Sequence, residues 1–312
     1  MTSISVIIPL FNKEKDIVKT LNSVCKQTYN DFEIIIVDDG STDLSVEKIK
    51  IINDNRISIF SKNNEGVSIA RNFGVEKAKS NFVAFLDADD YWHPNHLEKL
   101  LFLIRTYPNN DWFATSYEKK RTNVLITPMV SPIFEKGENW SGVVGDFFEN
   151  SLIDCLACAS SVCMKTDFFK SLNGFNSQTT HAEDIDLWIR AALLSPLVFS
   201  NEITSRHNLE ASNRSSKKLL KDRRYVDFNK FNKEENKNSS LKKYLDLNRY
   251  SLAIIYKLHG DTHSFKNIIS NVEIKNLNKK QQFLLKQHRY ILRLLFVFQE
   301  LLEKLGFRLS SF

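Results

Sequence analysis

The sequence lacks any long apolar segment. No uninterrupted apolar run approaches the roughly 18 residues that a membrane-spanning helix needs. Residues 1–4 begin neither the positively charged region nor the apolar core of a secretory signal. We therefore expect a cytoplasmic protein, and the hydrophobic share of 42% and the charged share of 26% are ordinary for a globular chain.

Glycine is scarce, at 9 of 312 residues, and the glycine-rich loops that cradle phosphates are absent. Neither the G-x-G-x-x-G of dinucleotide binding nor the G-x-x-x-x-G-K-[ST] of ATP binding occurs. A ligand with phosphate groups would therefore need another counter-charge, such as a cation held by carboxylates or an arginine.

Cysteine is also scarce. The four cysteines are Cys25, Cys155, Cys158 and Cys163, a number that fits free thiols in a reducing compartment. Cys155-x-x-Cys158 with Cys163 nearby also allows a zinc site, although no fourth ligand is evident beside them. We expect buried structural thiols, with the zinc site as the alternative.

Positive charge is scarce before residue 214 and abundant after it. Residues 214–312 contain 22 Lys and Arg against 9 Asp and Glu, whereas residues 1–213 contain 21 against 28. This asymmetry predicts one domain at 1–213 and a basic, mainly helical extension at 214–312. The aromatic residues of the extension are scattered and form no recognition motif, so we expect no nucleic-acid partner.

The first part of the chain alternates between apolar strands and amphipathic helices. Apolar runs at 3–9, 32–37, 57–60 and 82–86 are followed by helical patterns at 17–24, 46–52, 68–79 and from Pro94 onward. This alternation predicts an α/β fold with a mostly parallel, doubly wound sheet. Beyond residue 107 the periodicity weakens, and residues 110–150 are predicted to be irregular or to form short strands over the sheet edge.

Two acidic turns follow the second and the fourth predicted strands. Asp38 and Asp39 end one strand, and Asp87-Ala88-Asp89 with a further aspartate ends the other. In a doubly wound sheet, ligands bind outside the carboxyl ends of the strands, so both turns are expected at the binding edge. Three carboxylates within four residues favour a bound divalent cation. The alternative is a solvated turn that caps the next helix.

Arg71 and the Glu183-Asp184 pair are further candidates. Arg71 lies on a predicted helix and either supplies positive charge to a phosphate or is simply solvated. Glu183 and Asp184 begin a helix, where the dipole favours carboxylates even without a function. His93 and His96 flank Pro94 at another helix start and are expected at the surface.

Five groups of residues resemble the motifs of the family 2 glycosyltransferases with a GT-A fold. They are S-V-I-I-P-L-F-N at 5–12, V-D-D-G-S-T-D at 37–43, N-E-G at 64–66 with A-R-N at 70–72, F-L-D-A-D-D at 85–90 and E-D-x-D-L-W at 183–188. Their order and spacing make the resemblance specific. It covers residues 3–213, and the basic remainder carries nothing that resembles the family.

The resemblance implies a set of residues that bind a nucleotide-sugar donor. These are Pro9, Phe11, Asp38, Arg71, Asp87 and Asp89. In the family, the residues at the places of Pro9, Phe11 and Asp38 hold the nucleoside, with help from the arginine. The first aspartate of the D-x-D, here Asp87, lies near the ribose and the metal.

The resemblance also implies a metal site and a catalytic base. Asp89 would bind Mn²⁺ or Mg²⁺ on the diphosphate, and His207 would complete that site. Asp184 resembles the family's base. These roles agree with the chemistry of the transfer, because a carboxylate activates the acceptor hydroxyl and a divalent cation stabilises the departing nucleoside diphosphate.

Together these expectations predict a non-processive, inverting glycosyltransferase. It would move one sugar from a nucleotide-sugar donor, UDP-linked, to a hydroxyl of a glycan or lipid-linked acceptor in bacterial surface polysaccharide synthesis. The Q-x-x-R-W signature of processive synthases is absent, which favours single-sugar transfer. The alternative is a non-catalytic sugar-nucleotide or glycan-binding module of the same fold. A nucleotidyltransferase is disfavoured, because residues 10–13 form no glycine-rich, arginine-containing loop.

The end of the basic extension has an amphipathic pattern between Tyr290 and Leu305. Its apolar positions are Ile291, Leu294, Leu295, Phe298, Leu301, Leu302 and Leu305. Such a helix either lies on an anionic membrane or packs on the protein. The first alternative predicts peripheral attachment to the inner face of the cell membrane.

Overall fold

The computed structural model describes residues 3–211 and 222–307, which form two compact units. The sheet unit consists of Met1–Lys120, Thr127–Phe147 and Cys155–Val226, and the helical unit of Arg121–Ile126, Phe148–Asp154 and Asp227–Phe312. The predicted boundary between residues 213 and 214 lies outside the described residues.

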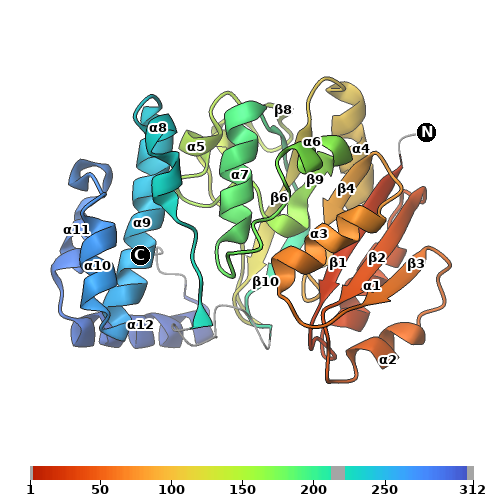
Figure 1. Cartoon of the computed structure of the whole chain (residues 1–312), viewed down its shortest axis with the longest axis horizontal. Helices are drawn as coiled ribbons and strands as arrows, with labels where there is room; N and C mark the ends of the chain where they lie inside the picture. The colour runs from red at the N-terminus through yellow and green to blue at the C-terminus, as the bar shows by residue number, and fades with distance from the viewer. Residues whose placement is uncertain (1–2, 212–221, 308–312) are drawn as a thin grey trace. The chain divides into compact units, whose positions relative to one another are not determined.

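The strands among the described residues form one ten-stranded sheet (Figure 1). They are β1 (Ile4–Leu10), β2 (Phe32–Asp38), β3 (Ile57–Ser61), β4 (Phe82–Phe85), β5 (Tyr91–Trp92), β6 (Trp112–Lys120), β7 (Ile126–Pro128), β8 (Ser141–Val143), β9 (Val162–Lys165) and β10 (Val198–Asn208). Their order is β3-β2-β1-β4-β9-β6-β10-β5, with β7 beside β6 and β8 beside β10.

The half of the sheet that contains β3, β2, β1 and β4 is entirely parallel. Its strands are connected by α1 (Ile17–Cys25), α2 (Ser45–Lys50) and α3 (Val67–Lys77). Figure 1 shows α3 crossing β1 and β2, and this approach depends on Gly74, where a Cβ atom would lie 2.5 Å from Ile7 Cγ2. The α/β architecture predicted from the alternating pattern is therefore confirmed.

The other half of the sheet is mixed. β9 runs antiparallel to both β4 and β6, whereas β10 runs parallel to β6. The prediction of irregular structure at 110–150 is wrong for β6, which is a nine-residue strand inside the sheet. Thr115 and Ser116 are fully buried in it. Because these polar side chains face the interior, the strand lacks the hydrophobic signal that marks a buried strand in a sequence.

His96 is buried, so the prediction that it lies at the surface is wrong. It is the first residue of α4 (His96–Thr106), and its ring packs on Trp92 with centroids 4.2 Å apart. Its Nδ1 lies 2.7 Å from Thr204 Oγ1, whereas Nε2 is buried with no hydrogen-bond partner among the described residues. Burial lowers the pKa of His96 to about 3, and the ring is therefore neutral.

Shorter helical segments surround the second half of the sheet. They are the 3-10 helices η1 (Pro132–Lys136) and η2 (Ala159–Ser161) and the α-helices α5 (Phe147–Asn150), α6 (Thr166–Ser171) and α7 (Glu183–Leu194). All four cysteines are free thiols, and Cys163 is the one that is fully buried.

The helical unit is built around α9 (Ser239–His259). The Asn238 side chain caps α9 by accepting a hydrogen bond from Leu241 N at 3.0 Å, and Gly260 ends the helix with a φ of 82°. Arg249, in the middle of α9, forms a buried ion pair of 2.6 Å with Glu235.

Other helical segments accompany α9 in this unit, which has a small apolar core of its own. They are η5 (Phe228–Phe231), α8 (Asn232–Glu235), α10 (Thr262–Ile269), η6 (Ile274–Asn276), α11 (Lys279–Lys286) and α12 (Arg289–Lys304). The core contains Tyr250, Ile254, Val272, Leu277, Leu284 and Leu292. The predicted helical character of the extension is confirmed. Within residues 3–211 and 222–307, no helix combines the length and apolarity needed to cross a bilayer.

Candidate active site

Of the two aspartates in the acidic turn at the end of β2, Asp38 lines a pocket and Asp39 holds a neighbouring loop. Asp39 accepts hydrogen bonds from Lys62 Nζ at 2.9 Å and from Gly66 N at 2.8 Å, so it fixes the loop that precedes α3. Asp38 is also buried, and its Oδ1 accepts a hydrogen bond from Ser41 N at 3.0 Å.

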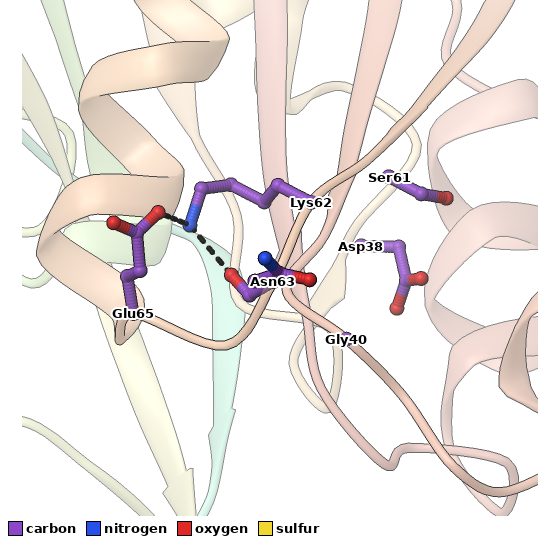
Figure 2. A pocket seen from close by; sticks show the side chains of 6 residues that line it. All are labelled: Asp38, Gly40, Ser61, Lys62, Asn63 and Glu65. Carbon is purple, nitrogen blue, oxygen red and sulfur yellow. Dashed lines mark hydrogen bonds and ion pairs between the residues drawn. The ribbon is translucent and has the colours of Figure 1, made fainter.

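A pocket of about 860 Å³ opens beside Asp38, a volume within the range of small-ligand sites. Its lining residues are Asp38, Gly40, Ser61, Lys62, Asn63 and Glu65. Figure 2 shows the Asp38 carboxylate and the Ser61 hydroxyl on one side, and the Lys62 ammonium on the other, bonded to Glu65 and to the Asn63 carbonyl oxygen. The pocket thus has acceptor groups at the carboxyl ends of β2 and β3.

The three carboxylates after β4 have different partners. Asp87 Oδ1 lies 2.5 Å from Arg71 Nη2, and Asp89 Oδ2 lies 2.6 Å from Lys13 Nζ. Asp90 is buried, with Ser160 Oγ 2.5 Å from one of its oxygens. Burial and the nearby charges of Asp89 and Asp87 raise the pKa of Asp90 well above its ordinary value. Asp87 and Asp89 thus face cations, whereas Asp90 accepts hydrogen bonds from the neutral Ser160 hydroxyl and Asn208 N.

Arg71 is buried, which excludes the alternative that it is a solvated surface arginine. Its guanidinium contacts Asp87 on one side and Glu183 Oε1, at 3.1 Å, on the other. Burial opposes its charge, but these two carboxylates outweigh burial and raise the pKa of Arg71. Burial would raise the pKa of Asp87, but Arg71 holds it below the ordinary value, with a smaller contribution from His207.

The N-terminus of α7 brings Glu183 and Asp184 to this cluster. It follows Ala182, whose left-handed φ of 62° is uncommon for a residue with a side chain and occurs at functional sites. Burial, followed by the charge of Asp184, raises the pKa of Glu183 to about 7. Burial also raises the pKa of Asp184. The two neighbouring carboxyls consequently titrate as a pair.

The remaining predicted residues lie at two strand ends, those of β1 and β10. Pro9 is buried in β1, paired with Val37, and Phe11 lies just past the end of β1. His207, near the end of β10, has its Nδ1 4.0 Å from Cys158 Sγ. The structure therefore brings Arg71, Asp87 and Glu183 into contact, and His207 is close enough to influence the pKa of Asp87.

Two contributors to this cluster were not predicted. Lys13 has no sequence signal, because it lies in a polar turn that looks solvated. Glu183 was noted only as a helix-start carboxylate, and its ion pair with Arg71 spans 112 residues of sequence. A pairing of that length cannot be read from local spacing.

The carboxylates of the acidic turn after β4 suit a hard divalent cation, because such ions prefer oxygen ligands. In proteins, Mg²⁺ is commonly held by one or two carboxylates together with substrate phosphates. Asp89 is suitable because its partner is the Lys13 ammonium, which lies at the end of a flexible side chain. Within the described part of the chain, no group of three or more His, Cys, Asp or Glu is arranged to hold a metal ion. The assignment of Asp89 and His207 to a metal site therefore stays a prediction.

Comparison with known proteins identifies the family. The family model described as "Glycosyl transferase family 2" matches residues 5–151, which include the pocket residues, Arg71 and the whole acidic turn. This chain carries a family 2 glycosyltransferase domain. The predicted family is thus confirmed.

Two relatives place this glycosyltransferase domain among bacterial proteins. An uncharacterised glycosyltransferase of Rickettsia felis is 36% identical over 197 residues, which are 61% of this chain and 30% of that protein. The Escherichia coli UDP-Glc:alpha-D-GlcNAc-diphosphoundecaprenol beta-1,3-glucosyltransferase WfgD is 29% identical over 227 residues, covering 72% of this chain and 84% of WfgD. The chain therefore spans less than a third of the Rickettsia felis protein and most of WfgD.

Solved structures confirm the GT-A fold of the glycosyltransferase domain. S. aureus TarS superposes with a TM-score of 0.61 at 19% identity, over 91% of this chain and 50% of TarS. Residues 1–349 of S. aureus TarS in complex with UDP-GlcNAc superpose with a TM-score of 0.60 at 18% identity, over 86% of this chain and 91% of that one. At these identities the likeness concerns the fold alone.

Proposed function

We propose that this chain transfers one sugar from a nucleotide-sugar donor to an acceptor hydroxyl, with inversion at the anomeric carbon. The observation that carries this proposal is the buried Arg71, which joins Asp87 of the acidic turn to Glu183 beside Asp184. A donor-binding group and a base are thereby held together in one ion-paired cluster. Transfer by a positioned base needs that arrangement.

In this proposal the donor occupies the carboxyl ends of β1, β2 and β4. Pro9, Phe11 and Asp38 hold the nucleoside at the pocket beside β2, and Arg71 with Asp87 positions the ribose and the diphosphate. We propose a UDP-linked donor. WfgD is named for UDP-Glc, and TarS has been solved with UDP-GlcNAc, which supports that choice.

We further propose that Asp89, together with His207, holds Mn²⁺ or Mg²⁺. The metal would supply positive charge to the diphosphate as the nucleoside diphosphate departs. Asp89 contributes an anionic oxygen at the mouth of the site, and Asp87 stays paired with Arg71. The absence of any glycine-rich phosphate loop supports a need for such a charge.

Asp184 is the proposed base. Burial raises its pKa, which makes it a stronger proton acceptor than an exposed aspartate. It removes the proton of the acceptor hydroxyl as the oxygen attacks the anomeric carbon from the side opposite the diphosphate. One displacement inverts that carbon and leaves no covalent intermediate on the protein.

The acceptor in this proposal is a glycan or a lipid-linked glycan in bacterial surface polysaccharide synthesis. The name of WfgD specifies a diphosphoundecaprenol-linked acceptor, and this chain covers 84% of WfgD. A lipid-linked acceptor lies at a membrane, so a device that holds the enzyme on the membrane surface would bring the two together.

We propose that α12 is this device and that it lies on the anionic inner face of the cell membrane. Its inner side buries Leu292, but an apolar stripe on its other side is exposed. The stripe consists of Tyr290, Ile291, Leu294, Val297, Phe298, Leu301 and Leu305. Residues 279–304 contain six Lys and Arg against two Glu, which complements anionic lipid.

The alternative is a non-catalytic module that binds a sugar nucleotide or glycan. It requires the same pocket and acidic turn but gives Asp184 no chemical role. The two proposals therefore differ at this residue.

Asp184→Asn is the test that separates them. Transfer and slow hydrolysis of UDP-Glc and UDP-GlcNAc are measured with Mn²⁺, together with UDP affinity and the melting temperature. If Asp184 is the base, UDP affinity persists while kcat falls by roughly 10²–10⁴-fold. Asp167→Asn is the control, because it removes an exposed carboxylate from the first turn of α6. A stable, UDP-binding Asp184→Asn protein with normal kcat would overturn the assignment.

A further inference from the structure

Two carboxylates of the acidic turn after β4 each form an ion pair with a cation of the chain itself. Asp87 has Arg71, and Asp89 has Lys13, whose Nζ is 2.6 Å from Asp89 Oδ2. The side chains of Lys13 and Asp89 are each only 12% exposed, so solvent screens this ion pair weakly.

The backbone of Lys13 is fixed in this place by the loop after β2. Lys13 N donates to Ser45 Oγ at 2.7 Å, and the preceding Asn12 N donates to Ser41 Oγ at 3.1 Å. Asn12 also accepts a hydrogen bond from Thr42 N at 2.8 Å and has a left-handed φ of 51°. These bonds hold the main chain, so movement of Lys13 is confined to its side chain.

A lysine is suited to change partners without a change in the backbone. Its ammonium is a compact charge with three donors on a flexible four-carbon stem. A diphosphate that enters beside Asp89 offers Lys13 new acceptor oxygens, and Asp89 is then released for another cation.

We propose that Lys13 is an internal counter-ion that occupies Asp89 until a nucleoside diphosphate arrives, and that it thereby makes metal binding depend on the donor. This inference rests on the proposed function, in which Asp89 binds the metal. Without the donor, a divalent cation at Asp89 must displace or tolerate the ammonium 2.6 Å away. With the donor, both cations have anionic partners.

The effect of UDP on Mn²⁺ binding and the effect of Mn²⁺ on UDP binding must be equal. If UDP raises the affinity for Mn²⁺ by some factor, Mn²⁺ raises the affinity for UDP by the same factor. Lys13 causes part of that factor by weakening metal binding to the free protein. Removal of its charge should therefore strengthen Mn²⁺ binding without UDP and reduce the factor.

The test measures Mn²⁺ binding by titration calorimetry and by electron paramagnetic resonance, with and without UDP, after correction for the Mn²⁺ that UDP binds in solution. Lys13→Met keeps the aliphatic stem and removes the charge. Lys15→Met is the matched control, because Lys15 is exposed two residues away. We expect Lys13→Met to bind Mn²⁺ without UDP about tenfold more tightly than wild type. The coupling to UDP should fall by a similar factor, and Lys15→Met should match wild type.

Two outcomes would overturn the inference about Lys13 and leave the proposed function intact. The first is equal Mn²⁺ affinities of wild type and a folded Lys13→Met in the absence of UDP. The second is a wild-type Mn²⁺ affinity that UDP does not change. The second measurement needs no variant. A wild-type protein that binds UDP but no Mn²⁺ under either condition would overturn the metal part of the proposed function as well. Donor binding would stand in that case.

Discussion

Arg71 and Glu183 form an ion pair of 3.1 Å across 112 residues of sequence. The same guanidinium lies 2.5 Å from Asp87, so one buried cation sets the distance between the acidic turn after β4 and the first residue of α7. Asn72, the next residue, supports this arrangement: its amide exchanges hydrogen bonds with the backbone N and O of Phe175, at 2.9 and 2.8 Å.

Removal of Arg71 should destabilise the protein strongly. Arg71→Met leaves Asp87 and Glu183 close together without their cation, and loss of one partner from a buried ion pair costs about 3–5 kcal/mol. Because the Asp87 side chain is 32% exposed, we expect the lower end of that range. Urea unfolding of wild type, Arg71→Met and the charge-conserving Arg71→Lys measures the effect. A loss below about 1 kcal/mol in Arg71→Met would mean that the pair is not buried as described.

The pH dependence of transfer should report the Glu183-Asp184 pair. Burial raises the pKa of Asp184, and burial with the charge of Asp184 raises the pKa of Glu183 to about 7. A base must be deprotonated to act, so kcat should fall as pH decreases, at a higher pH than an exposed aspartate would give. Rates across pH 4–9 on saturating donor test this. Glu183→Gln removes one negative charge from the pair and should move the acidic limb to lower pH; an unchanged limb would exclude the coupling.

His96 should make the protein less stable in mild acid. In the folded state the pKa of His96 is about 3, whereas in the unfolded chain the same imidazole binds a proton near its ordinary pKa of 6.5. The folded state thus binds fewer protons, and its stability is lost as pH falls below that ordinary value. The linkage amounts to about 2 kcal/mol between pH 7 and pH 5.

The variant His96→Gln should lose this part of the pH dependence. Free energies of unfolding at pH 7 and pH 5 are compared for wild type, His96→Gln and His263→Gln, an exposed histidine that serves as the control. The difference between the two pH values should shrink in His96→Gln only. An equal pH dependence in all three proteins would contradict the assignment of a neutral, buried His96.

Binding of α12 to lipid can be tested with vesicles. Wild type should co-sediment with phosphatidylglycerol vesicles at low salt and less with phosphatidylcholine vesicles, because cations and an apolar stripe act together. The double variant Leu294→Gln, Leu301→Gln should lose binding without unfolding, since both side chains are more than half exposed. Ile51→Gln, which changes an exposed isoleucine of the sheet unit, is the control. Wild-type protein that stays in the supernatant would exclude the membrane proposal.

The sequence predicts the parallel half of the sheet well because its signals are local. Each strand there is an apolar run with a helical pattern behind it, and both acidic turns directly follow their strands. β9 and β10 were not predicted. β9 has only four residues, and β10 mixes Ser200, Asn201 and Thr204, all buried, with apolar side chains. Such strands are defined by their partners rather than by their own periodicity.

The sequence singles out candidate residues for the site but not the ion pairs between them. Asp87, Asp89 and Asp184 stand out as carboxylates at element ends, but nothing local indicates that Lys13 meets Asp89 or that Arg71 meets Glu183. His96 was misjudged for the same reason, since its partner Thr204 lies 108 residues away. Burial of a polar side chain depends on these distant partners, and one sequence does not reveal them.

The position of β9 has a consequence for the order in which the protein folds during synthesis. β4 pairs with β1 on one side and with β9 on the other, where Phe82 faces Lys165. At about 5–20 residues per second, a ribosome completes β9 several seconds after β4. During that interval β1, β2 and β3 can pair, while the other edge of β4 offers its backbone to any neighbouring chain. A fragment that ends before β9 should therefore aggregate, even though it contains every strand of the parallel half of the sheet.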